Sequence, residues 1–326
     1  MSLPAQTLRT LETPRVVVDH ARLAANIGRV AALARAAGVA MRPHIKTHKC
    51  REIARMQLAA GAAGLTASKT DEALVFIEDG APSLTVAYPV LDGRKLDRLL
   101  ATAKERGCDL RMLADSEPGA MALAAAAERY AVDLSVFLKI DVGLHRCGLA
   151  PDAPGLLPLA RRIVEAKRLR LAGLLSHAGH AYGAKDAAQV RDIAREENRL
   201  MNVAAARLRG AGLEVPEISV GATPTVLAGD AWEGVTEIRP GNSVFMDRTP
   251  LRLGLAGLGD MALWVLATVV SANQDWLIVD AGSKVLSSDG GAHGSGMEGY
   301  GLAWGLDAPE EMASALPVRK LSEEQD

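Results

Sequence analysis

Aromatic side chains and cysteines are both scarce in this chain of 326 residues. Phe, Trp and Tyr together make up 3% of the sequence, so the core has to be built from Ala, Leu and Val. The three cysteines, Cys50, Cys108 and Cys147, lie far apart and form no CxxC pair. This spacing excludes a zinc knuckle and is typical of a reducing compartment.

Excess charge and long apolar runs are missing as well. The 37 basic and 39 acidic residues are well mixed and leave a net charge of −2, so no basic stripe favours nucleic acid. The N-terminal residues 1–6 lack the charged-then-apolar pattern of a signal peptide, and no apolar run reaches the about 18 residues of a membrane span. We therefore expect a cytoplasmic protein that binds neither nucleic acid nor membrane.

Strands and helices alternate along most of the chain. Several of the predicted helices are closed by a glycine, as at Gly61, Gly80 and Gly107. From residue 39 onward, eight predicted strands cover residues 39–45, 64–68, 83–88, 109–114, 134–140, 170–176, 217–221 and 235–239. The alternation indicates a parallel sheet, and eight units predict an α/β fold of the (β/α)8 TIM barrel type. A doubly wound open sheet is the alternative, but no GxGxxG follows the first strand.

The rhythm changes after about residue 250. Residues 264–272 and 276–282 have strand patterns with no helix between them. The sequence therefore predicts two parts, a barrel over residues 20–250 and a partial β domain over residues 251–326. The strand pattern at residues 14–19 predicts that residues 1–19 join the β domain.

Residues 42–50 (RPHIKTHKC) hold three cationic side chains and two histidines at the end of the first barrel strand. Alternation along that strand places Lys46 at its carboxyl tip, on the face opposite the apolar residues. A lysine beside other cations has a lowered pKa and a nucleophilic amine, which suits Schiff-base formation. A basic turn over a solvated strand end is the ordinary alternative.

The carboxyl ends of the other strands carry unusual residues on the same face, where barrels place their chemistry. Arg146 lies between glycines on the loop after the fifth strand, and His177 ends the sixth. Small-residue turns at 221–223 and 241–242 follow the last two strands and suit a phosphate group. Each feature alone is more often a surface arginine, a structural histidine or a simple turn. Together they predict a site for pyridoxal phosphate.

The segment around Lys46 resembles the lysine motif of the D-threonine aldolase and D-serine dehydratase family. This family belongs with the alanine-racemase-like, fold-type III pyridoxal phosphate enzymes. Matching motifs follow in family order at residues 141–148, 219–225, 237–242 and 280–284. The set covers about residues 10–324 and is specific.

The resemblance implies a role for each matching residue. Lys46 is expected to be the Schiff-base lysine and Arg146 to face the pyridine nitrogen, while His177 joins Lys46 as a catalytic residue. The cofactor-binding set implied is Lys46, Arg146, His177, Tyr182, Gly221, Ala222, Thr223, Gly241 and Asn242, of which residues 221–223 and 241–242 hold the phosphate and His177 and Tyr182 line the ring. A guanidinium at the ring nitrogen keeps that nitrogen unprotonated, because Arg has no proton acceptor.

A divalent metal, Mn or Zn, is also expected for the family, bound by a His and a Cys late in its β domain. Here Gln325 stands where the family has a His, and the sequence stops at Asp326. The expectation is therefore a β domain truncated at its C-terminus and no metal ligand in this chain. His293 is the only late histidine, and without a partner it is not assigned to a metal.

By resemblance, the chain is expected to be a lyase acting on a small D-3-hydroxy amino acid. The D-threonine aldolase reaction, retro-aldol cleavage to glycine and an aldehyde, is preferred. D-serine dehydratase chemistry is the alternative, in which Lys46 takes the Cα proton and the products are a keto acid and ammonia. A weakly catalytic pyridoxal phosphate-binding protein is also possible, as is a racemase, for which Tyr300 in a glycine-rich loop is a poor second base. A homodimer is expected by resemblance.

Overall fold

The computed structural model describes residues 5–230, 232–288 and 297–324. The chain divides into two compact units. The first consists of Ile27–Ala181 and Ala188–Asn242, and the second of Met1–Asn26, Tyr182–Ala187 and Ser243–Asp326. No helix in the described part of the chain has the length and apolar character needed to cross a bilayer.

The first unit is built on eight parallel strands. They are β2 (Ala40–Met41), β3 (Leu65–Ala67), β4 (Ser83–Val86), β5 (Asp109–Ala114), β6 (Leu134–Lys139), β7 (Leu169–Leu175), β8 (Glu217–Val220) and β9 (Glu237–Ile238). Their order in the sheet is β2-β9-β8-β7-β6-β5-β4-β3. A parallel bridge between His44 and Thr66 joins the two ends of this order. The predicted α/β barrel fold is confirmed.

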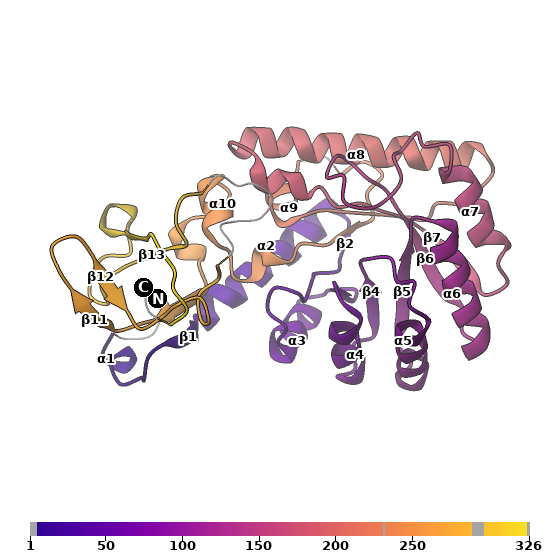
Figure 1. Cartoon of the computed structure of the whole chain (residues 1–326). Helices are drawn as coiled ribbons and strands as arrows, with labels where there is room; N and C mark the ends of the chain where they lie inside the picture. The colour runs from indigo at the N-terminus through magenta and orange to yellow at the C-terminus, as the bar shows by residue number, and fades with distance from the viewer. Residues whose placement is uncertain (1–4, 231, 289–296, 325–326) are drawn as a thin grey trace. The chain divides into compact units, whose positions relative to one another are not determined.

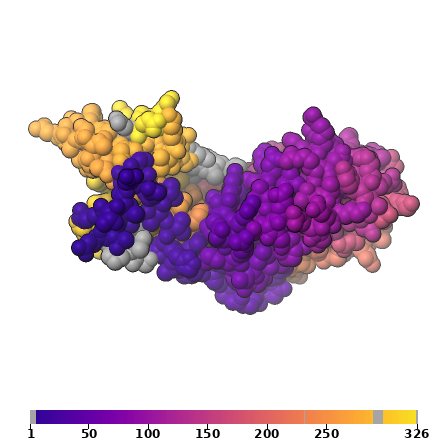
Figure 2. Space-filling model, turned by 90° about the horizontal axis from the view of Figure 1, so that it is seen from below, coloured from indigo at the N-terminus to yellow at the C-terminus, as the bar shows by residue number. Residues whose placement is uncertain are grey.

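Helices follow most of these strands in the chain (Figure 1). They are α3 (Arg51–Ala59), α4 (Thr70–Glu78), α5 (Gly93–Arg106), α6 (Glu117–Tyr130), α7 (Leu156–Glu165), α8 (Ala187–Gly210) and the short α9 (Thr223–Ala228), while α2 (His20–Ala37) precedes β2. Figure 2 shows part of the outer surface of this unit as closely packed atoms, in purple to pink. Strands β4 and β6 are buried along their whole length, as expected for parallel strands covered on both faces.

The sequence specifies the helix ends through local chemistry. Asp92 caps α5 by accepting from the Arg94 and Lys95 amides, and Gly107 ends the helix with a φ of 64°. A left-handed residue at this position satisfies the last carbonyls, and glycine adopts it without a Cβ penalty. Gly107 therefore closes this helix, as the sequence predicts.

A buried ionic network crosses the interior of the barrel. The Glu237 carboxylate on β9 accepts from Arg42 Nε at 2.7 Å, from Ser219 Oγ at 2.6 Å and from Arg111 Nη1 at 3.2 Å. Arg42 also donates to Ser83 Oγ at 2.7 Å. A buried charge is tolerated where it is paired and hydrogen-bonded, as each of these is. The network ties the strand that leads to Lys46 to strands β4, β5, β8 and β9.

The second unit is rich in short antiparallel strands. Strand β1 (Arg15–Val18) pairs with β10 (Leu263–Leu266), β11 (Val269–Ala272) with β12 (Leu277–Val279), and β13 (Gly301–Ala303) with β14 (Leu316–Val318). The unit also contains α1 (Ala5–Leu8) and α10 (Arg248–Arg252). Arg22 binds Glu310 at 2.6 Å within it. The predicted strand at 14–19 therefore pairs with the late strands.

Candidate cofactor site

Lys46 lies in a turn that follows β2. The regular strand ends at Met41, because Pro43 has no amide hydrogen to continue the ladder, and only His44 returns to a bridge with Thr66. The prediction of a strand through residue 45 was therefore wrong in length. The turn remains at the carboxyl edge of the barrel, since the His44 amide donates to the Pro240 carbonyl at 3.0 Å.

The Lys46 turn packs against the predicted phosphate segment. A Cβ added at Gly241 would lie 3.0 Å from the Cβ of His44 and 3.4 Å from Oγ1 of Thr47. These distances are shorter than ordinary van der Waals contacts, so a side chain at residue 241 would require the turn to move by a few tenths of an ångström. The structure therefore brings the residues on either side of Lys46 into contact with residue 241, as the predicted site requires.

The electrostatic surroundings of Lys46 favour the neutral amine. Although much of the side chain is exposed to solvent, protein atoms packed around the amine lower its pKa by desolvation, and the charge of Arg146 lowers it further. The Glu72 carboxylate acts in the opposite direction. A neutral lysine amine is the nucleophilic form, so this environment supports imine formation.

Arg146 lies in the loop that connects β6 to α7. The base of the loop is closed by a bridge between Ile140 and Leu149. Inside it, the Asp141 carboxylate accepts from the Gly143 and His145 amides at 3.1 and 3.0 Å and contacts His145 Nδ1 at 2.9 Å. The charge of Arg146 lowers the pKa of Lys46, so the loop holds the guanidinium within electrostatic reach of the amine.

His177 follows β7 and contacts the turn after β8. Its Nδ1 atom lies 3.3 Å from the Gly221 carbonyl, which can only accept a hydrogen bond. Nδ1 is therefore the protonated nitrogen, and Nε2 carries the lone pair. Burial, followed by the charge of Lys139, lowers the pKa of His177 well below its ordinary value. His177 is thus a neutral imidazole with a proton acceptor at Nε2.

The predicted phosphate turns lie next to each other. The Gly241 amide donates to Thr223 Oγ1 at 3.2 Å, which joins the segment after β9 to the start of α9. The Ala222 amide donates to Thr225 Oγ1 at 2.9 Å, and the Gly221 amide to a Glu197 carboxylate oxygen at 3.3 Å. These amides stabilise the turn itself. The Thr223 and Thr225 amides, in the first turn of α9, have no carbonyl acceptor within the helix and suit an anion.

Two buried cations, which the sequence analysis did not identify, lie beside these residues. Lys139 at the end of β6 is 3% exposed, and burial lowers its pKa to about 7. Arg239, 1% exposed, donates to the carbonyls of Ser176 and Val220, and burial lowers its pKa to about 10. Both charges lower the pKa of His177. A cation-rich region of this kind favours anionic ligands.

Two further expectations from the sequence concern Tyr182 and a metal ion. Tyr182 belongs to the second unit, so its predicted place beside the cofactor ring stays a prediction. Within residues 5–230, 232–288 and 297–324, no three or more His, Cys, Asp or Glu side chains are placed to hold a metal ion. His293 lies outside the described residues, as does Gln325.

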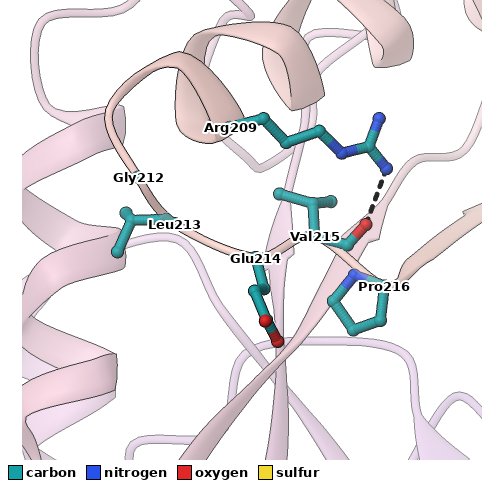
Figure 3. Close-up of a pocket in the computed structure, with 6 residues that line it drawn as sticks. All are labelled: Arg209, Gly212, Leu213, Glu214, Val215 and Pro216. Atoms are coloured by element: carbon teal, nitrogen blue, oxygen red, sulfur yellow. Dashed lines mark hydrogen bonds between the residues drawn. The ribbon is translucent and has the colours of Figure 1, made fainter.

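A separate surface pocket opens where α8 leads into β8 (Figure 3). It is lined by Arg209, Gly212, Leu213, Glu214, Val215 and Pro216, and Arg209 donates to the Val215 carbonyl at 2.7 Å. These residues precede β8 and lie at its amino end, whereas the Lys46 turn lies at the carboxyl edge. Because barrel chemistry is found at the carboxyl edge, we do not assign this pocket to the site.

The chemistry of these side chains fits pyridoxal phosphate. Lys46 supplies an amine of lowered pKa for the aldehyde, and Thr223 with the first turn of α9 supplies donors for a phosphate. Arg146 supplies a permanent cation near the amine. The buried His44 Nδ1 atom beside Gly241 has no partner among the described residues. The cofactor roles predicted for Arg146, His177, Gly221, Ala222, Thr223, Gly241 and Asn242 stay predictions.

Known proteins share both the sequence and the fold. Residues 18–249 match the family model described as alanine racemase, N-terminal domain. D-threo-3-hydroxyaspartate dehydratase of Delftia sp. (strain HT23) is 40% identical over 87% of this chain and 75% of its own length. Its solved structure superposes with a TM-score of 0.88 over 98% of this chain and 84% of that chain, at 36% identity.

Two further relatives carry other lyase names. D-threonine aldolase of an Arthrobacter species is 32% identical over 88% of this chain and 76% of its own length. D-serine dehydratase of Dictyostelium discoideum is 31% identical over 87% of this chain and 76% of its own length. The chain spans about three quarters of each of these relatives.

The fold and the matched region thus define a barrel of a pyridoxal phosphate-dependent class. The chain belongs to the alanine racemase N-terminal domain family, within the group that contains the D-threo-3-hydroxyaspartate dehydratase, D-threonine aldolase and D-serine dehydratase lyases. The resemblance seen in the sequence is confirmed, and the chain is a member of a lyase group.

Proposed function

We propose that this protein is a pyridoxal phosphate-dependent dehydratase acting on small D-3-hydroxy amino acids, with D-3-hydroxyaspartate as its type of substrate. The observation that carries the proposal is the Lys46 amine, whose pKa is lowered by burial and by Arg146, in a turn packed against Gly241. The sequence motifs favour aldol cleavage. The 40% identity to a D-threo-3-hydroxyaspartate dehydratase supports dehydration instead.

The charge of the site supports an anionic substrate. Lys139, Arg146 and Arg239 lie within electrostatic reach of His177, and each lowers its pKa. A phosphate group and a substrate α-carboxylate offset part of this charge. A second carboxylate on the substrate side chain would offset more, which favours a dicarboxylic substrate over D-serine or D-threonine.

The residues of the chain have distinct parts in this reaction. When bound, pyridoxal phosphate withdraws electrons from the Cα atom of an attached amino acid. Lys46 would hold the cofactor and, once the substrate amine has displaced it, would accept the Cα proton as a free amine. His177 offers Nε2 as a second proton acceptor, while Thr223 and the first turn of α9 hold the phosphate. Loss of the β-hydroxyl as water leaves an enamine, and its imine tautomer is then hydrolysed by water to a keto acid and ammonia.

Aldol cleavage is the second candidate, because a D-threonine aldolase is also a relative. In that reaction, a base takes the proton of the β-hydroxyl and the Cα–Cβ bond breaks to give glycine and an aldehyde. A family metal, Mn or Zn, would assist either route by polarising the hydroxyl.

The test is a product assay on the purified protein loaded with pyridoxal phosphate. D-threo-3-hydroxyaspartate, D-serine and D-threonine are supplied separately, each with and without added Mn or Zn. We expect keto acid and ammonia in equal amounts, fastest with the dicarboxylic substrate. Lys46→Ala should abolish product, whereas Lys49→Asn should not, since Lys49 is exposed and has a φ of 46° that Asn accepts.

Each product pattern has one meaning. If the products are glycine and an aldehyde, the protein is an aldolase and the dehydratase proposal is rejected. No product from any substrate, with cofactor still attached to Lys46, would reject the lyase and leave a pyridoxal phosphate-binding protein.

A further inference from the structure

Glu197 is a buried carboxylate on α8 that the proposed mechanism does not use. Its exposed fraction is 2%, and it lies on the apolar face of a long helix with Met201, Ala204 and Leu208. A carboxylate in such a place costs free energy unless it is hydrogen-bonded. Its contacts therefore indicate what it stabilises.

One oxygen of Glu197 holds the ends of two strands. Ser176 Oγ, directly after β7, donates to Oε1 at 2.6 Å, and the Gly221 amide, directly after β8, donates to the same oxygen at 3.3 Å. Ser176 is fully buried and precedes His177. Gly221 opens the turn that leads to Thr223. Glu197 thus connects the residue before the histidine to the turn that carries the phosphate donors.

Both backbone polar groups of Gly221, the amide and the carbonyl, have partners. Its amide donates to Glu197, while its carbonyl lies 3.3 Å from His177 Nδ1. Its φ is +112°, and a Cβ there would lie 2.8 Å from Cγ2 of Val226, so the conformation is specific to glycine. Arg239 adds a further hydrogen bond to the Ser176 carbonyl.

We propose that Glu197 is a positioning residue that, through Gly221 and Ser176, fixes the phosphate turn at the start of α9 and the orientation of His177. This inference rests on the proposed function, since it assumes that the turn binds the phosphate of pyridoxal phosphate. Glu197 acts through these residues, since its oxygen accepts from Ser176 Oγ and from the Gly221 amide.

The experiment compares two ligands that differ only in the phosphate. Dissociation constants of pyridoxal phosphate and pyridoxal are measured on the apo-protein, and the pyridoxal constant divided by the pyridoxal phosphate constant gives the contribution of the phosphate. Glu197→Ala removes the acceptor, and Glu197→Gln keeps an acceptor oxygen but loses the charge. Glu196→Ala, one residue away on the exposed face and paired with Arg199, is the matched control.

We expect the ratio to fall at least about tenfold in Glu197→Ala, because a buried amide loses a charged acceptor, and about threefold in Glu197→Gln. Pyridoxal binding and the Glu196→Ala ratio should stay within about twofold of wild type. A ratio within about twofold of wild type in either Glu197 variant that folds would overturn the inference, as would an equal loss of both ligands. If the wild type shows no Lys46-dependent binding of pyridoxal phosphate, the proposed function fails too.

Discussion

Cationic groups dominate the site at the scale of single residues. Burial lowers the pKa values of Lys46, Lys139, Arg239 and His177, and repulsion from neighbouring cations lowers them further. Such mutual repulsion is costly in the protein alone and is relieved when an anion binds. Burial and this repulsion together lower the pKa of Lys46 and of His177, which favours the neutral form that reacts.

Replacing Arg146 with Leu tests this electrostatic account. Burial and the Arg146 charge both lower the Lys46 pKa, so removing the charge should raise that pKa. The rate at which apo-protein takes up pyridoxal phosphate should then rise with pH at a higher midpoint than in wild type. Stopped-flow absorbance across a pH series measures the midpoint. Arg161→Ala on the exposed face of α7 is the control, and an unmoved midpoint in Arg146→Leu would contradict the account.

Lys139→Met should make the protein more stable at neutral pH. The folded pKa of Lys139 is about 7 against an ordinary 10.5, so the unfolded chain binds more protons between these values. Stability of the wild type therefore rises with pH across this window. Relative to wild type, the free energy of unfolding of the variant should be higher by on the order of a few kcal/mol at pH 7, and this difference should disappear toward pH 10. Urea unfolding at several pH values measures this difference in stability. A difference that does not change with pH would contradict the lowered pKa of Lys139.

Turns matter most at the scale of elements, because they carry the functional groups between regular strands and helices. The turn after β8 combines Gly221, with its positive φ, and the first turn of α9. Gly221→Ala should cost about 1–3 kcal/mol through backbone strain and the contact with Val226. It should also weaken pyridoxal phosphate binding, since the amide bonded to Glu197 shifts.

The control for this substitution is Gly93→Ala in α5. Nothing lies within 4 Å of a Cβ at Gly93, so this change should be neutral or slightly stabilising. Urea midpoints of the two variants give the comparison. Equal stability of the two would show that the turn after β8 tolerates a side chain and would remove the reason for a glycine there.

Sequence patterns predicted most elements of the barrel, because glycine ends and apolar strands are local signals. They did not predict the length of β2, which depends on Pro43 and on the partner strand. They predicted that Lys46, Arg146 and His177 follow three of the parallel strands, as the structure shows, while the cofactor roles of these residues stay predictions. Glu197 was missed because an acidic residue on a helix is usually solvated, although its spacing with Met201 and Leu208 marks it as part of the buried face.

At the scale of the whole molecule, the chain joins a barrel that its relatives share to a second unit of short strand pairs. The family match covers residues 18–249, and the solved dehydratase structure superposes over 98% of the chain. Pairing of β1 with β10 could not be read from sequence, because strands so far apart give no local sign of their partner. The expected homodimer stays a proposal.

The central claim is that pyridoxal phosphate is attached to Lys46. The most direct measurement is reduction of the loaded protein with borohydride, followed by proteolysis and mass spectrometry of the lysine-bearing peptides. The account predicts one modified residue, Lys46, and no label in Lys46→Ala. A label on Lys49 or Lys139 instead, or no label on the wild-type protein, would contradict it.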